Sequence, residues 1–220
     1  MSYLLGSVPA GYLVGRAHGI DLRTVGSGNV GATNTVRALG KRWGIAVFLF
    51  DFIKGFVPAY VGLAASSAWT PWSADATALT FGIAAVLGHV FPVWLRFKGG
   101  KGVATSGGMC AGLCPPAAIG TLIIWVLALK ISKYVSVASM VAAGAFPALF
   151  VLSVGPEVAF GDRRLVTLLS IVLAVLIFWL HRANIGRLRR GEEHRVGAAN
   201  GKDAQKTGTT GTTGTEGETG

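Results

Sequence analysis

The sequence predicts an all-α polytopic membrane protein with about seven transmembrane helices, the N-terminus outside and the C-terminus in the cytoplasm. Of its 220 residues, 51% are hydrophobic and only 14% are charged, whereas an average soluble domain has about 25% charged residues. Apolar runs recur along nearly the whole chain, and cations collect in alternate connections between them. This composition excludes a soluble globular enzyme.

The apolar segments follow one another with short polar connections between them. Several approach the ~20 residues that a helix needs to cross a hydrocarbon core of about 30 Å. The fourth, Val103 to Leu113, is short and rich in glycine, and we leave open whether it crosses as a regular helix. The other expected spans are 2–15, 44–65, 76–95, 115–129, 135–154 and 165–180.

The first segment is shorter than a comfortable span. Residues 2–15 would give a helix of about 21 Å at 1.5 Å per residue, and Arg16 follows directly. We therefore expect either that the translation start lies upstream or that this helix is tolerated by leaning on its neighbours.

The positions of lysine and arginine set the expected orientation. By the positive-inside rule, connections rich in cations face the cytoplasm. The cation-rich connections would place the polar motifs on the cytoplasmic face of the membrane. Their cations are Arg16, Arg23, Arg37, Lys41, Arg42, Arg96, Lys98, Lys101, Lys130, Lys133, Arg182, Arg187, Arg189, Arg190 and Arg195.

The chain divides into a membrane domain, residues 1–196, and a Gly/Thr-rich cytoplasmic tail, residues 197–220. The tail has almost no apolar groups to bury, so we expect it to be disordered. The net charge of +10 fits anchoring to anionic headgroups, and we expect no nucleic-acid partner because the cations flank spans. No metal-ligand spacing is apparent, and Cys110 and Cys114 are expected to be packing residues.

Residues 26–31 read GSGNVG and satisfy the dinucleotide-binding pattern G-x-G-x-x-G. That fingerprint requires a preceding strand and a surrounding βαβ unit. Here it lies in a polar connection between two expected membrane helices. The nucleotide interpretation therefore fails on context, and the loop calls for another phosphate ligand.

Three polar segments fall on the expected cytoplasmic side: 27–37, 98–105, and 181–185 with Glu193 beyond it. Glycines let backbone N–H groups turn inward together and form a nest for anions. Arginine and lysine add fixed positive charge suited to phosphate. The pattern predicts a site for a phosphorylated substrate and a phosphorylated donor. Its members are Ser27, Asn29, Thr33, Asn34, Arg37, Lys101 and Thr105.

Other interpretations stay open at this point. Each loop alone could be an ordinary glycine-rich turn with snorkelling cations. A transporter or channel for a phosphorylated or anionic solute also uses broken helices and glycine loops, although these motifs cluster on one face and no repeat relates two halves. A purely structural membrane protein is the third alternative.

Charged side chains also occur inside the expected second span. Asp51 and Lys54 lie three residues apart, so they can pair on one helix face. Ionisable residues inside a membrane usually indicate a functional site. A structural ion pair is an equally good interpretation of these two residues. His89, one turn inside the third span, is expected to be a packed, hydrogen-bonded residue.

The strings GSGNVGATN-x-x-R-A-L-G, GH-x-x-P-x-x-x-x-FKGGKGVAT and HR-x-NI-x-RL resemble the three motifs of the bacterial glycerol-3-phosphate acyltransferases that use acyl phosphate as donor. The resemblance runs from about Leu4 to Arg195. It implies a seven-helix inner-membrane enzyme that makes lysophosphatidic acid in the first acylation of phospholipid synthesis. The family usually has several more apolar residues before Ser2.

The resemblance also implies roles for individual residues. Its first motif implies Ser27 and Arg37 as catalytic residues, and its third implies His181 and Asn184. Its second motif implies a loop that holds the phosphate of glycerol 3-phosphate. The implied supporting residue is Glu193, and the implied substrate-binding residues are Asn29, Thr33, Asn34, Gly99, Gly100, Lys101, Gly102, Ser136 and Ser139. The residue pattern itself adds Thr105 to the substrate-binding candidates, and Asp51 and Lys54 to the supporting ones.

The chemistry of acyl phosphate fits this assignment. It is an activated mixed anhydride, so an enzyme needs mainly to position the nucleophile and neutralise charge. We expect direct transfer without an acyl-enzyme, because no Ser-His-Asp or Cys-His set is apparent. The base is either His181 or the donor's own phosphate. The implied partners are glycerol 3-phosphate, acyl phosphate and membrane lipid, with no cofactor, and we also consider a handover from the enzyme that makes acyl phosphate.

Overall fold

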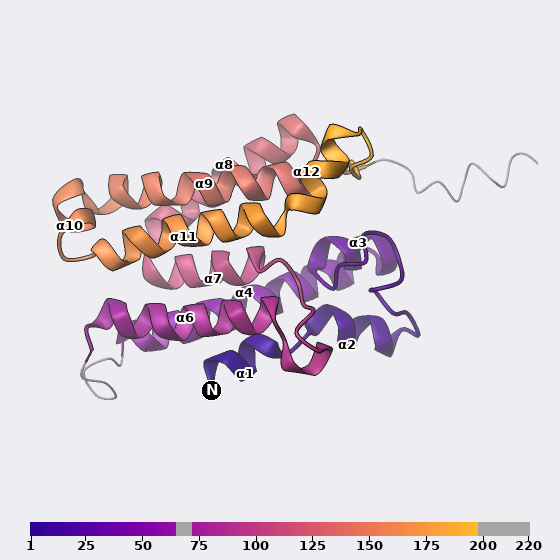
Figure 1. The fold of residues 1–220 in the computed structure, drawn as a ribbon, viewed down its shortest axis with the longest axis horizontal. Coiled ribbons are helices and arrows are strands. Elements are labelled where there is room, and N and C mark those ends of the chain that lie inside the picture. Colours follow the sequence, from indigo (N-terminus) through magenta and orange to yellow (C-terminus); the bar gives the residue numbers. More distant parts are fainter. Residues whose placement is uncertain (65–71, 198–220) are drawn as a thin grey trace, which may run out of the picture.

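The computed structural model describes residues 1–64 and 72–197, and every regular element in those ranges is helical. This confirms the all-α prediction. Figure 1 shows two groups of roughly parallel helices, with α1, α2, α4 and α6 in one, α8, α9 and α11 in the other, and α7 between them. The elements are α1 (Ser2–Ser7), α2 (Ala10–Ala17), α3 (Ala32–Leu39), α4 (Lys41–Ala64), α6 (Ala74–Val90), η1 (Val93–Leu95), α7 (Val103–Leu113), α8 (Pro115–Ser132), α9 (Val135–Val154), α10 (Pro156–Phe160), α11 (Arg164–Leu180) and α12 (Arg182–Arg189).

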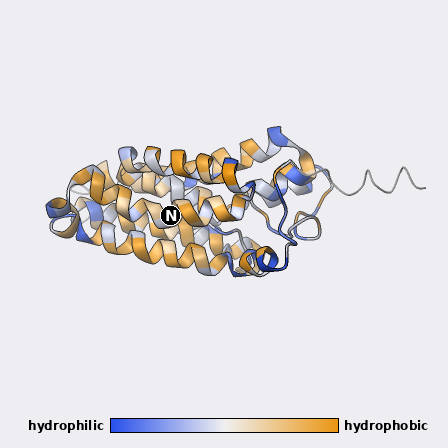
Figure 2. Ribbon diagram, turned by 90° about the horizontal axis from the view of Figure 1, so that it is seen from above, coloured by the Kyte–Doolittle hydropathy of each residue, from blue (hydrophilic) through white to orange (hydrophobic). Residues whose placement is uncertain are grey.

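Four helical segments of the described chain are long and apolar enough to cross a membrane: α4, α6 with η1, α8 and α9. A fifth follows if α11 and α12, which meet at a bend of 52°, count as one span. Apolar residues run along the helices, and hydrophilic residues gather at the ends of the molecule (Figure 2). The prediction of a multi-spanning membrane protein is thus confirmed.

The first apolar segment is not the single helix expected over 2–15. It breaks at Val8 and Pro9 into α1 and α2, because proline has no N–H to donate and forces the preceding residue into an extended conformation. The short α1 packs tightly on α6: a Cβ added to Gly6 would lie 2.1 Å from the carbonyl oxygen of Ala85. The segment therefore leans on its neighbour, which was one of the two alternatives expected.

Helix α7 is regular over its 11 residues, but a helix of that length spans only about 16 Å. It is enclosed by α4, α6 and α8. Small residues permit this close approach, since a Cβ added to Gly55 of α4 would lie 1.9 Å from the carbonyl oxygen of Thr105. The fourth apolar segment is thus a regular internal helix.

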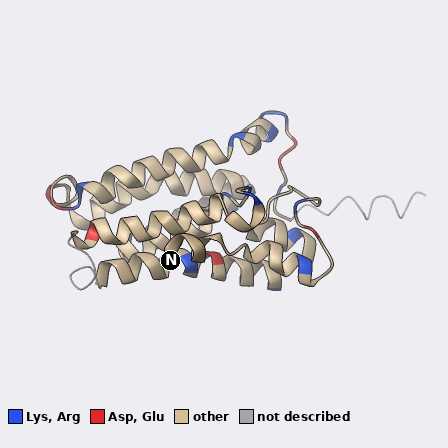
Figure 3. Cartoon of the chain, turned by 60° about the horizontal axis from the view of Figure 1, so that its bottom comes forward, with Lys and Arg blue, Asp and Glu red and all other residues tan. Residues whose placement is uncertain are grey.

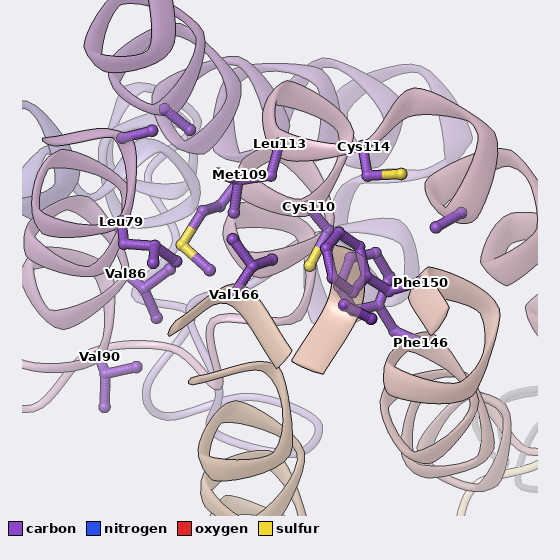
Figure 4. Close-up of a cluster of buried hydrophobic side chains, with 14 residues drawn as sticks. Leu79, Val86, Val90, Met109, Cys110, Leu113, Cys114, Phe146, Phe150 and Val166 are labelled. Carbon is purple, nitrogen blue, oxygen red and sulfur yellow. The ribbon is translucent and has the colours of Figure 1, made fainter. Parts of the chain in front are cut away.

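The hydrophobic core joins the two groups of helices. Met109, Cys110 and Leu113 of α7 lie in one buried cluster with Phe146 and Phe150 of α9 (Figure 4). Cys110 and Cys114 are free thiols in this cluster, as expected of packing residues.

Most of the cations in the described chain gather at the end of the molecule that carries α3 and α12 (Figure 3). At the opposite end, Arg163 donates to the Asp75 carboxylate through Nε at 2.9 Å and a terminal nitrogen at 2.7 Å. The fold therefore separates a basic end from an end where Arg163 is paired with Asp75. The candidate site lies at the basic end. Residues 198–220, most of the expected tail, lie outside the described chain.

Candidate active site

A cavity opens at the basic end, between α3 and α4 on one side and α9 and α12 on the other. It holds about 840 Å³ of space partly open to solvent. All three polar segments identified in the sequence contribute to its wall, so the expected convergence of segments distant in sequence is observed. The lining residues are Ser27, Asn29, Gly31, Ala32, Thr33, Asn34, Arg37, Phe48, Asp51, His89, Lys101, Gly102, Val103, Ala104, Trp125, Val135, Ser136, Ser139, His181, Asn184 and Glu193.

The first segment forms a loop that Asn34 holds in place. Asn34 is 1% exposed, its Oδ1 accepts from the Ser27 backbone N–H at 3.0 Å, and its Nδ2 donates to the carbonyls of Leu22 and Val25, both at 3.0 Å. Asn29 Oδ1 likewise accepts from the Gly31 N–H at 2.8 Å. The amides of Asn34 and Asn29 are thus engaged within the loop, which they shape.

Ser27, Thr33 and Arg37 remain directed to the cavity. The Ser27 and Thr33 hydroxyls have no hydrogen-bond partner within the described chain, and Thr33 and Arg37 are four residues apart on one face of α3. The N-terminal end of α3 also faces the cavity, since Gly31, Ala32 and Thr33 line it. The unpaired N–H groups of a helix start favour anions.

In the second segment, two glycines do not have the phosphate-binding role expected of them. The N–H groups of Gly99 and Gly100 donate to the carbonyls of Val90 at 3.0 Å and His89 at 3.1 Å, so they do not form a nest for phosphate. Both residues must be glycine because an added Cβ would lie 2.4 Å from Pro92 Cδ at the first and 2.1 Å from His89 Nε2 at the second. Their role is to seat the loop against α6.

The anion-binding groups of this segment come instead from Lys101 and the start of α7. Gly102 precedes the helix with φ +74°, and Val103 and Ala104 of the first turn line the cavity. Thr105, expected among the substrate ligands, is fully buried and does not line the cavity. The helix turns this position towards α4 instead of the cavity. The Thr105 hydroxyl has no hydrogen-bond partner in the described chain.

Lys101 joins the two sides of the cavity by donating to Asn184 Oδ1. Burial is the main cause that lowers the pKa of Lys101 to about 8; the positive charges of Arg187 and Arg37 act in the same direction, and the negative charge of Glu193 opposes them. Three cations are thus close enough to interact around one carboxylate. Such an excess of positive charge favours a ligand with several negative charges.

The third segment forms a network around Glu193. Its Oε1 accepts from Asn184 Nδ2 at 2.6 Å and from Ser136 Oγ at 2.9 Å, and its Oε2 accepts from Arg187 Nε at 2.7 Å. Burial opposes the ionised form, but the hydrogen bonds from Asn184, Arg187 and Ser136 outweigh it and lower the pKa of Glu193 below its usual value. Glu193 and Ser136 therefore hold Asn184, whose oxygen faces Lys101.

His181 follows the last residue of α11 and is buried at the cavity wall. Its Nδ1 lies 2.8 Å from the Ile177 carbonyl oxygen, and a carbonyl can only accept, so Nδ1 carries the proton. In the neutral ring Nε2 is then the acceptor. Ser139 also lines the cavity and accepts from Trp125 Nε1 at 3.4 Å.

The structure adds residues that the sequence interpretation did not include. Arg187 takes part in the network, Phe48 and Trp125 supply apolar wall, and His89 reaches the cavity. Arg187 lies three residues after Asn184, so the helical spacing signalled it, whereas nothing in the sequence placed Phe48 or Trp125. The predicted pair of Asp51 and Lys54 is present at 2.7 Å. Within the described chain, no group of three His, Cys, Asp or Glu side chains could hold a metal ion.

Comparison with known proteins decides the family. The family model described as glycerol-3-phosphate acyltransferase matches residues 1–191. The chain belongs to this family. Among its curated members, the glycerol-3-phosphate acyltransferases of Aquifex aeolicus and Thermus thermophilus are 44% and 45% identical to it over 196 and 199 residues. These alignments cover 88% and 90% of this chain, and 95% and 92% of the relatives.

Two solved structures share the fold. Both are described as PlsY (YgiH), an integral membrane glycerol 3-phosphate acyltransferase, one in the glycerol 3-phosphate form and one in the lysophosphatidic acid form. They match with TM-scores of 0.77 and 0.74 at 42% and 41% identity, over 89% of this chain and 92% of theirs. The family resemblance of the motifs is thus confirmed, and these findings favour an acyltransferase over a transporter.

Proposed function

We propose that the protein transfers an acyl group from acyl phosphate to the sn-1 hydroxyl of glycerol 3-phosphate, giving lysophosphatidic acid and inorganic phosphate. The observation that carries this proposal is one cavity with two helix starts and two cations on its wall. Arg37 lines the cavity from the last turn of α3, and Lys101 lines it just before the start of α7. Two such positions suit two phosphorylated substrates.

The two phosphates are assigned by the chemistry around each position. Lys101 and the first N–H groups of α7 hold the phosphate of glycerol 3-phosphate. Ser27, Arg37 and the start of α3 hold the phosphate of the donor. Arg37 offers a bidentate fork, which suits a leaving group whose oxygens must be held in one orientation. Phe48 and Trp125 provide apolar wall against which the first carbons of an acyl chain can lie.

The reaction is a direct acyl transfer. The hydroxyl oxygen of glycerol 3-phosphate attacks the acyl carbon and forms the new ester bond, while the bond from that carbon to the phosphate oxygen breaks and phosphate leaves with the electron pair. His181 Nε2 accepts the hydrogen bond of the attacking hydroxyl and takes its proton as the ester bond forms, and the ring then passes a proton from Nε2 to the departing phosphate. No serine or cysteine side chain in the described chain bonds to a histidine ring, which supports transfer without an acyl-enzyme.

The arrangement in the membrane follows from the charges. We assign seven crossing segments: α1 with α2, α4, α6, α7, α8, α9 and α11. The basic end with the cavity then faces the cytoplasm, the N-terminus lies outside, and the membrane is the bacterial inner membrane. The donor would reach the cavity from the enzyme that makes acyl phosphate. Residues 1–196 form the catalytic domain, and the tail is dispensable.

The decisive experiment supplies the purified, detergent-solubilised protein with glycerol 3-phosphate and one donor at a time: acyl phosphate, acyl-CoA or acyl-carrier protein. We expect rapid lysophosphatidic acid formation with acyl phosphate alone. Equal use of acyl-CoA would overturn the donor assignment. Turnover in detergent also tests the transporter alternative, because transport needs two compartments and catalysis does not.

The variant Lys101→Ala tests the assignment of the two phosphates. It should raise the KM for glycerol 3-phosphate more than the KM for acyl phosphate. If the KM for the donor rises instead, the two phosphate positions are exchanged.

A further inference from the structure

Three ionisable side chains inside the membrane-spanning helices have no part in the chemistry proposed above. Asp51 and Lys54 on α4 and His89 on α6 are 3%, 2% and 8% exposed. Ionisable groups at such a depth are expensive to bury and are kept where they serve a site. Through their contacts, these three side chains connect the break between α1 and α2 to the phosphate-binding loop.

Lys54 is held by two oxygens. Its Nζ lies 2.7 Å from Asp51 Oδ1 and donates to the Val8 carbonyl oxygen at 3.0 Å. Val8 precedes the break between α1 and α2, where Pro9 has no N–H to offer. The ammonium group therefore fixes the Asp51 carboxylate from one side.

The same oxygen of the Asp51 carboxylate also faces His89. Asp51 Oδ1 lies 3.5 Å from His89 Nδ1, an electrostatic contact between α4 and α6 that sets how the ring is turned. Both side chains reach the wall of the substrate cavity. The ring edge that carries Nε2 then points to the loop 98–102.

His89 is the surface on which this loop rests. The Gly100 N–H donates to the His89 carbonyl at 3.1 Å. A Cβ added to Gly100 would lie 2.1 Å from His89 Nε2, and one added to Gly99 would lie 2.1 Å from the His89 carbonyl oxygen. Lys101 and the start of α7 follow at once, so a shift of the ring shifts them too.

We propose that Asp51 and Lys54 are positioning residues that act through His89 to place the phosphate-binding loop. Asp51 fixes the imidazole, the imidazole seats Gly99 and Gly100, and the seated loop aims Lys101 at the substrate. The proposal rests on the proposed function, which assigns the phosphate of glycerol 3-phosphate to Lys101. A merely structural ion pair would stabilise the helices and leave the affinity for this substrate unchanged.

Two double variants with the same charge separate these roles. Asp51→Asn with Lys54→Met removes both charges and keeps an oxygen opposite His89 Nδ1, whereas Asp51→Leu with Lys54→Met removes that oxygen as well. We expect the first to raise the KM for glycerol 3-phosphate only slightly, because an oxygen still faces His89 although Lys54 no longer holds it. We expect the second to raise this KM on the order of tenfold, with kcat and the KM for acyl phosphate less affected. Thermal unfolding in the same detergent compares their stabilities. Equal values of the KM for glycerol 3-phosphate in the two would overturn the proposal.

A double-mutant cycle of Gly100→Ala and His89→Ala tests the contact without touching the ion pair. We expect Gly100→Ala to raise the KM for glycerol 3-phosphate in the wild-type background and to add little once the ring is gone. Additive effects would contradict seating by His89. These outcomes are read against wild-type turnover: inactivity of the wild-type protein with acyl phosphate would refute the proposed function, whereas normal wild-type turnover with unaltered variants would refute only the positioning role.

Discussion

Replacement of Glu193 tests whether the site needs Asn184 to be held in one orientation. Its carboxylate accepts from Asn184, Ser136 and Arg187 at 2.6, 2.9 and 2.7 Å. In Glu193→Gln the remaining oxygen can still accept from Asn184 and Ser136. The new amide N–H₂ group, however, faces the Nε–H of Arg187, so two donors oppose each other and one charge-assisted hydrogen bond is lost.

The size of the effect follows from the contacts. A hydrogen bond to a charged group contributes about 1.5–3 kcal/mol, and the Arg187 side chain is 24% exposed, which favours the lower end of that range. A loss of about 1.4 kcal/mol lowers kcat/KM about tenfold in Glu193→Gln. Glu193→Ala removes all three partners and leaves buried donors on Asn184 and Ser136, so we expect a loss of about 3 kcal/mol, or roughly 150-fold.

The assay measures kcat/KM for each substrate in purified, detergent-solubilised protein, with thermal unfolding recorded in parallel. Glu192→Gln is the matched control, because Glu192 is the adjacent residue and its pair with Arg190 is exposed at 56% and 60% of the two side chains. Exposed pairs contribute little, so this variant should match the wild type. Wild-type activity of Glu193→Gln, or an equal loss in Glu192→Gln, would refute the role of the network.

Three further predictions concern other charges. Because burial lowers the pKa of Lys101 to about 8, its charge is present below that pH and lost above it. Thus kcat/KM for glycerol 3-phosphate should fall above about pH 8, and in Lys101→Arg the fall should move to higher pH; a wild-type profile that stays flat would contradict this. Arg37→Lys should stay at least about tenfold below wild-type kcat/KM, since a point charge cannot replace a bidentate fork, and near-normal activity would rule that fork out. Arg163→Met should lower the midpoint of thermal unfolding by several degrees and leave activity at 25 °C unchanged, because its bonds to Asp75 and Leu113 lie at the end opposite the cavity; an unaltered midpoint would show that the pair is not stabilising.

Most of the fold could be predicted from hydropathy, because a bilayer requires long apolar helices and little else satisfies the backbone. Hydropathy predicts one helix for the first segment, but Pro9 interrupts it, because proline cannot continue the hydrogen-bond pattern of a helix. The packing of α7 could not be predicted. Its 11 residues are apolar like a span, and only the packing of α4, α6 and α8 around it shows that neighbouring helices enclose it.

The site could be predicted as a set of segments but not as a set of ligands. Positive charge placed three polar segments on one face, and the structure brings them together around one cavity. Which side chain faces a ligand depends on helix rotation, which tertiary packing sets. Successive residues of a helix point about 100° apart, so Ala104 lines the cavity while Thr105 is turned away. We expected Asn34 to bind substrate, but both the oxygen and the nitrogen of its side-chain amide form hydrogen bonds within the loop.

The two glycine-rich loops have a common physical purpose that neither motif reveals alone. In both, hydrogen bonds within the protein engage several N–H groups of the loop. The loops turn the starts of α3 and α7 into the same cavity, whose wall also carries Arg37 from the last turn of α3 and Lys101 from the segment before α7. A cation supplies attraction over a range of positions, whereas the N–H groups of a fixed helix start accept an anion in one direction. Under the proposed function, affinity and orientation for each phosphate would therefore come from different groups, and the two helix starts would set the distance at which the hydroxyl and the acyl carbon meet.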